Sequence, residues 1–126
     1  MKLSAIRVAV LGTMGLRIMY GVGLLVAPAP LTRRWLGSAA DTAPTQVPLR
    51  GLGTREAVLH AGAAVAASRG AAVRPWLLAS VAGDLTDIVA TVAHRRHLPQ
   101  GAALATTAVA GGSALISMLL VIAVDE

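Results

Sequence analysis

Five ionisable side chains interrupt otherwise apolar stretches of the sequence. They are Arg17, Glu56, His60, Asp84 and Asp87. Carboxyl groups three residues apart, such as those at 84 and 87, lie one turn apart on a helix and suit acid–base chemistry, proton exchange or ion binding. An arginine among apolar residues suits an anionic partner, either a carboxylate of the same protein or an acidic part of a ligand.

Polar and small residues recur at intervals of four, three and four in three segments, which predicts one polar face on each of three helices. The sets are Thr13, Arg17, Tyr20 and Leu24; Ser80, Asp84, Asp87 and Thr91; and Thr106, Ala110, Ser113 and Ser117. Glu56 and His60, four residues apart, share a face of another helix. All of these faces fall near the middle of their segments, so we expect one polar cluster at mid-depth.

A charged side chain at the centre of a membrane helix costs about 2.5–3.5 kcal/mol on insertion scales. The helix that carries Asp84 and Asp87 is therefore expected to need Arg17 or Arg55 opposite its carboxylates, or protons, or water. We assign Asp84, Asp87 and Glu56 as candidate catalytic groups. The candidate ligand-binding residues are Arg17, Arg50, Arg55, His60 and Tyr20. A purely structural ion pair is the alternative for each charged group.

Metal binding by Glu56, His60 and the two aspartates is not expected, because their spacing lacks the repeated Glu-x-x-His pattern of metal-binding helical bundles. The sequence has no Cys, which excludes disulfides and cysteine-based metal or redox sites. We therefore expect no metal and no cofactor.

Four segments are predicted to cross a membrane, at residues 5–27, 54–68, 76–93 and 102–124. The first is expected to end at Pro28, and residues 28–51 to form a long connection in which Leu31–Leu36 makes a short interfacial turn. The second segment is short, and residues 49–53 before it are expected to be irregular, with Arg50 beside the cluster. Residues 1–126 thus form a single integral membrane domain.

Composition supports this fold class. Of the 126 residues, 56% are hydrophobic and only 13% charged, whereas a soluble domain carries about 25% charged residues. The net charge of +5 comes from scattered arginines beside apolar runs, and aromatic residues are 2% of the chain, so nucleic-acid binding is not expected. We predict an all-α, four-helix transmembrane bundle with a buried polar cluster, placed as a multi-pass protein in the cell membrane.

The segment Arg50-Gly-Leu-Gly-Thr-Arg-Glu56, followed by an Ala-rich helix and then Gly83-Asp-Leu-Thr-Asp87, resembles one known group. It is similar to the uncharacterised small four-helix membrane proteins of the DUF4267-like type, in which a Gly-x-Arg-acid segment precedes one span and acidic residues occur in the next. The resemblance covers about residues 50–90. It implies a membrane bundle and no assigned reaction.

The expected function is the handling of protons or of a small lipophilic or anionic ligand in an intramembrane carboxylate–arginine pocket, including acid–base chemistry on a lipophilic substrate. The alternatives are a proton-coupled small transporter subunit and a structural subunit of a membrane complex. The partners expected are the lipid bilayer, such a ligand, and a second copy or a membrane complex.

Overall fold

The structure, a computed structural model, describes residues 2–125, and that part of the chain consists of helices and short connections, with no β-strand. The α-helices are α1 (Lys2–Val26), α2 (Pro28–Leu36), α3 (Ala43–Ser68), α4 (Arg74–Ala93) and α5 (Ala102–Asp125), with short 3₁₀ turns at Gly37–Asp41 and Arg95–His97. The all-α prediction is confirmed. The predicted count of four helices is wrong, because the described residues form five α-helices.

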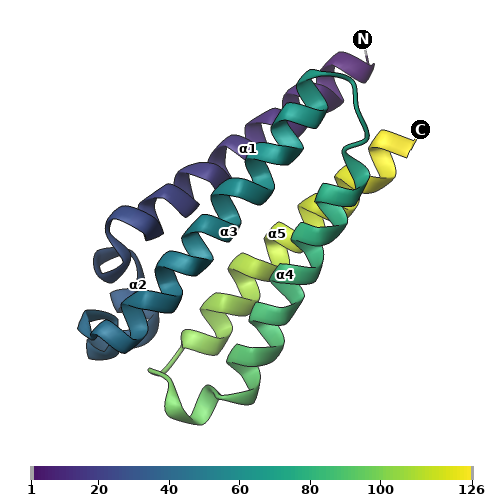
Figure 1. Ribbon diagram of the computed structural model, residues 1–126. Helices are drawn as coiled ribbons and strands as arrows, with labels where there is room; N and C mark the ends of the chain where they lie inside the picture. The colour runs from purple at the N-terminus through teal and green to yellow at the C-terminus, as the bar shows by residue number, and fades with distance from the viewer. Residues whose placement is uncertain (1, 126) are drawn as a thin grey trace.

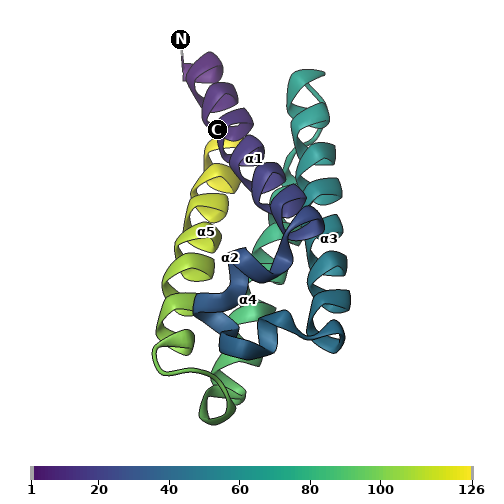
Figure 2. The same ribbon diagram turned by 90° about the vertical axis from the view of Figure 1, so that its left-hand side faces the viewer.

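The four long helices form an antiparallel bundle in which α1 lies beside α3 and α4 lies beside α5 (Figure 1). The start of α1, the connection from α3 to α4 and the end of α5 share one end of the bundle (Figure 1). Helix α2 lies near the other end, where it contacts α1, α3 and α5 (Figure 2). It thus covers one side of the space between the two helix pairs.

Proline and glycine set the boundaries of α2. Pro28 follows Ala27, which leaves the helical region with φ −140° and ψ 68°, because a residue before proline is disfavoured in the α conformation. Gly37 has φ 62° and ends α2, a backbone angle that glycine adopts without the steric cost of a side chain. The expected turn at residues 31–36 is therefore the body of a nine-residue helix.

Helix α3 departs most from the prediction, since it begins at Ala43 instead of near residue 54. Pro48 lies inside it, in the second turn, and residues 49–53 are helical instead of irregular. Its 26 residues extend about 39 Å at about 1.5 Å per residue, which exceeds the roughly 30 Å of a bilayer core.

Small residues bring α1 and α3 close together. A Cβ atom added to Gly53 would lie 2.5 Å from the carbonyl oxygen of Gly21, and one added to Gly21 would lie 2.6 Å from the carbonyl oxygen of Gly53. Only glycine permits this approach of the two backbones. A Cβ atom on Gly62 would lie 2.3 Å from the ring of Trp76, so that ring packs against α3.

Three helices are long and apolar enough to cross a membrane, by length and composition: Ser4–Val26, Arg74–Ala93 and Ala102–Val124. Helix α3, which carries Arg50, Arg55 and Glu56, is not among them. Large apolar side chains on all four long helices are exposed, among them Val8, Val58, Leu85 and Leu115.

Candidate functional site

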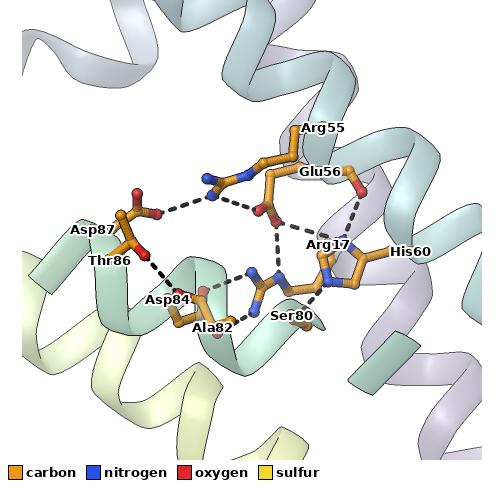
Figure 3. A network of polar contacts seen from close by, with 9 residues as sticks. All are labelled: Arg17, Arg55, Glu56, His60, Ser80, Ala82, Asp84, Thr86 and Asp87. Atoms are coloured by element: carbon orange, nitrogen blue, oxygen red, sulfur yellow. Dashed lines mark hydrogen bonds and ion pairs between the residues drawn. The ribbon is translucent and has the colours of Figure 1, made fainter. Parts of the chain in front are cut away.

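Arg17, on α1, joins the carboxylates of two other helices (Figure 3). Its two terminal nitrogens donate to the two carboxylate oxygens of Asp84, on α4, at 2.8 and 2.7 Å. Its Nε donates to Oε2 of Glu56, on α3, at 2.9 Å. The expected meeting of Arg17 with the carboxylates of the third predicted span is confirmed for Asp84, whereas Asp87 pairs with Arg55. This two-bond geometry is the strongest form of an arginine–carboxylate pair.

Arg55 extends the network from Glu56 to Asp87 (Figure 3). One of its terminal nitrogens donates to Oε1 of Glu56 at 3.3 Å and to Oδ2 of Asp87 at 3.1 Å. The side chains of Glu56 and Asp84 are each 4% exposed, whereas that of Asp87 is 35% exposed. Asp87 is therefore the least paired and most accessible carboxylate of the three.

His60 adds an uncharged branch to the network on α3. Its Nδ1 lies 2.6 Å from the backbone carbonyl oxygen of Glu56, which can only accept a hydrogen bond, so in the neutral ring Nδ1 carries the proton. Nε2 then accepts from the hydroxyl of Ser80, on α4, at 2.9 Å. Both side chains are buried. The spacing of polar residues predicts that Ser80 lies on the polar face of its helix, but it does not predict the hydrogen bond to His60.

The network holds three carboxyl groups and two guanidinium groups, so it is negatively charged when all of them are ionised. Its two guanidinium groups, Arg17 and Arg55, face three carboxylates, Glu56, Asp84 and Asp87, so with His60 neutral one negative charge is left over. An uncompensated charge away from water is costly. The arrangement therefore favours a proton or a cation at the accessible carboxylate.

Four of these charged groups, Arg17, Glu56, Asp84 and Asp87, line a cavity of about 410 Å³ that all five helices bound. The walls are largely apolar, and the lining residues are Leu16, Arg17, Tyr20, Leu31, Trp35, Leu52, Glu56, Asp84, Asp87, Ala105, Thr106, Val109, Ala110 and Ser113. The polar face predicted for the last helix supplies Thr106, Ala110 and Ser113. The sequence predicts only an interfacial turn for residues 31–36, which include Trp35, and no local pattern indicates that α2 folds over the bundle.

A second, more open hollow of about 450 Å³ lies between α2 and α3, and Arg55 lines it. Leu52 and Asp87 line both hollows. The Arg55–Asp87 ion pair therefore lies between the cavity of about 410 Å³, called the inner cavity below, and the more open hollow of about 450 Å³, called the outer hollow.

Seven of the eight predicted site residues line the inner cavity or belong to the polar network beside it. Arg50 does neither. Tyr20 lines the cavity, and the other six form the network of Figure 3. Arg50 is exposed and donates to the backbone carbonyl oxygen of Leu25, at the end of α1. Residues 49–53 are helical instead of irregular, and Arg50 lines neither of the two hollows, although Leu52 of the same stretch lines both.

Among the described residues, no three His, Asp or Glu side chains converge in a way that could hold a metal ion. Comparisons with protein-family models, curated proteins and solved structures found no match to this chain. The role of the cavity is therefore inferred from its geometry.

Proposed function

We propose that this chain is a multi-pass membrane protein whose inner cavity binds a small, largely apolar molecule. The observation that carries the proposal is the cavity itself: about 410 Å³, largely apolar walls, and four ionisable side chains that contribute to the lining. Small-molecule sites are typically concave, about 300–1,000 Å³ in volume, and mostly apolar with a few convergent polar groups. The resemblance to the DUF4267-like group, which rests on the Gly-x-Arg-acid segment at residues 53–56 and the acids at 84 and 87, is part of this proposal.

We further propose that α3 is a fourth span, which places the network near mid-depth in the cell membrane. Three observations support this: the length of α3, its close packing on α1 through Gly21 and Gly53, and the pairing of Arg55 and Glu56 within the bundle. Paired charges that face a bundle interior are tolerated in membranes.

The span count can be tested with single cysteines, because the natural sequence has none. Ser38→Cys precedes α3, Ala72→Cys follows it, and Gln100→Cys lies between α4 and α5. Four spans require a membrane-impermeant maleimide to label Ser38→Cys and Gln100→Cys from one side and Ala72→Cys from the other. Labelling of Ser38→Cys and Ala72→Cys from the same side would show that α3 does not cross.

Ligand binding can be tested by filling the cavity from α5. Ala105 lines the cavity, whereas Ala108, on the same helix, is exposed and does not. In protein that carries Trp76→Phe, so that only Trp35 fluoresces, we expect saturable quenching by 1-bromonaphthalene to persist in Ala108→Phe and to be lost in Ala105→Phe. If quenching rises linearly in the Trp76→Phe protein and in both further variants alike, the compound only partitions into the bilayer and the cavity does not bind it.

Within this proposal the chemistry centres on Asp87, since Asp84 and Glu56 are buried and engaged by arginine. In an enzyme, Asp87 serves as the acid or base toward the bound lipophilic molecule; in a proton-coupled transporter it exchanges a proton for the ligand. Arg17 and Arg55 then hold the carboxylates in place and do not bind a ligand anion.

The second candidate is a structural subunit of a dimer or a larger membrane complex. The observation that favours it is the pairing of every carboxylate in the network with an arginine, which fixes how α1, α3 and α4 sit against one another. The binding measurement on Ala105→Phe and Ala108→Phe separates the two candidates, because a purely structural cluster predicts no saturable ligand.

A further inference from the structure

Charge is distributed unevenly around the inner cavity. Of the charged groups that line it, one is positive, Arg17, and three are negative. Arg55 lines the outer hollow and reaches the network from that side. The cavity wall is therefore more acidic than the network as a whole.

The one positive group in the wall is already occupied. Each of the three nitrogens of Arg17 donates to a carboxylate oxygen, at 2.7 to 2.9 Å. A ligand anion would have to displace Asp84 or Glu56, both of which are almost fully buried. The remaining accessible charge belongs to Asp87, which accepts a single hydrogen bond, at 3.1 Å, from a nitrogen that Glu56 shares.

Aromatic side chains supply a second, independent indication. The chain has only three aromatic residues, two Trp and one Tyr, and two of these, Tyr20 and Trp35, line this cavity. The faces of such rings attract cations, with Trp the most effective. Aromatic rings and a predominance of acidic groups therefore occur together in one small space.

We propose that the cavity selects a small organic cation: a molecule with one ammonium group and an apolar body. The ammonium group lies at Asp87 and balances the excess negative charge, while Tyr20 and Trp35 contact it or the adjoining carbons. Leu16, Leu52 and Val109 hold the apolar body. This inference rests on the proposed function, since it names the class of ligand that the cavity binds.

The test compares three probes of nearly equal shape in nanodiscs of phosphatidylcholine, whose headgroup has no net charge. They are 4-butylbenzyltrimethylammonium, the neutral compound in which carbon replaces its nitrogen, and 4-butylbenzenesulfonate. The protein carries Trp76→Phe, so that Trp35 is the only fluorescent tryptophan. Equilibrium dialysis of the same probes against the wild type makes the result independent of that substitution.

We expect saturable binding of the cation at least about tenfold tighter than that of the neutral compound, a difference of about 1.4 kcal/mol in binding free energy. Asp87→Asn should remove that preference. Asp41→Asn, at an exposed acid outside the cavity, should leave it unchanged. The sulfonate should bind more weakly than the neutral compound.

Each other outcome overturns the inference in a distinguishable way. Equal affinity for the cation and the neutral compound, or an unchanged preference in Asp87→Asn, refutes the selection of cations and leaves the ligand cavity in place. Tighter binding of the sulfonate reverses the assigned charge. No saturable binding of any of the three probes refutes both the inference and the proposed function.

Discussion

Asp84→Asn and Asp87→Asn each remove one negative charge from the same network, yet the structure predicts unequal losses of stability. Both oxygens of Asp84 accept from Arg17, at 2.8 and 2.7 Å, and the side chain is 4% exposed. Asp87 accepts one bond at 3.1 Å and is 35% exposed. The two aspartates therefore carry the same functional group but differ in burial and in the number of hydrogen bonds that they accept from arginine.

The expected magnitudes follow from burial. Removing one partner of a buried ion pair costs about 3–5 kcal/mol. In Asp84→Asn, Arg17 loses the carboxylate that accepts from both of its terminal nitrogens and keeps only the bond to Glu56. Removing one partner of an accessible pair costs about 0–1 kcal/mol, because water and screening replace most of the interaction. We therefore expect Asp84→Asn to lower the free energy of unfolding by at least about 2 kcal/mol more than Asp87→Asn does.

Reversible unfolding in mixed micelles, followed by the helical circular dichroism signal, measures this difference. The double variant Arg17→Gln with Asp84→Asn should be more stable than the sum of the two single losses predicts, because it leaves no unpaired charge between these two residues. Equal losses for Asp84→Asn and Asp87→Asn, or a greater loss for Asp87→Asn, would refute the assignment of Asp84 as the buried partner of Arg17.

Three further predictions concern packing, the buried hydrogen bond and pH. Gly53→Ala should lower the free energy of unfolding by about 1–3 kcal/mol, since its Cβ atom would meet the α1 backbone at 2.5 Å. Gly51→Ala, whose Cβ atom would have open space around it, should instead stabilise the protein by about 0.5–1 kcal/mol. Equal effects of the two variants on unfolding in micelles would contradict the close α1–α3 contact. Ser80→Ala should lower the free energy of unfolding by about 1–3 kcal/mol, because it leaves Nε2 of the buried His60 without a hydrogen-bond partner. A ¹⁵N spectrum of the His60 ring that does not differ from that of the wild type would argue against this hydrogen bond. The hydrogen bond from Arg33 lowers the pKa of Asp41. The contribution of this ion pair to the free energy of unfolding is therefore fully present above the ordinary aspartate pKa and is lost as pH falls through the lowered value. A carboxyl ¹³C titration should show a higher pKa for Asp41 in Arg33→Gln than in the wild type, and identical titrations would exclude the pair.

Much of the polar network followed from spacing and cost. Asp84 and Asp87 share a helical face, and two unpaired carboxylates in an apolar helix need a partner at the same height. Arg17, near the middle of an apolar segment, met that requirement, and the structure pairs it with Asp84. The local sequence was enough to predict this ion pair, because helical periodicity and the energetic cost of an unpaired charge can both be judged from short segments.

The extent of α3 and the covering role of α2 were not predictable in the same way. Pro48, Gly51 and Gly53 indicate a broken chain when read locally, yet all three lie inside one helix. Gly53 is there because α1 approaches its backbone, a contact that no local pattern contains. The position of Trp35 in the cavity wall likewise depends on how α2 folds back over the bundle.

The most direct test of the account is a measurement of the pairing of Arg17 in lipid bilayers. Solid-state NMR of protein labelled with ¹⁵N-arginine and ¹³C-aspartate, with Asp84→Asn as the difference sample, detects dipolar coupling between the guanidinium nitrogens and the Asp84 carboxyl carbon. The N–O distances of 2.7 and 2.8 Å predict the strong coupling of a directly hydrogen-bonded pair. Coupling of the Arg17 nitrogens to lipid ³¹P instead, with none to Asp84, would show that this side chain faces the headgroups and that the cavity lacks the network described here.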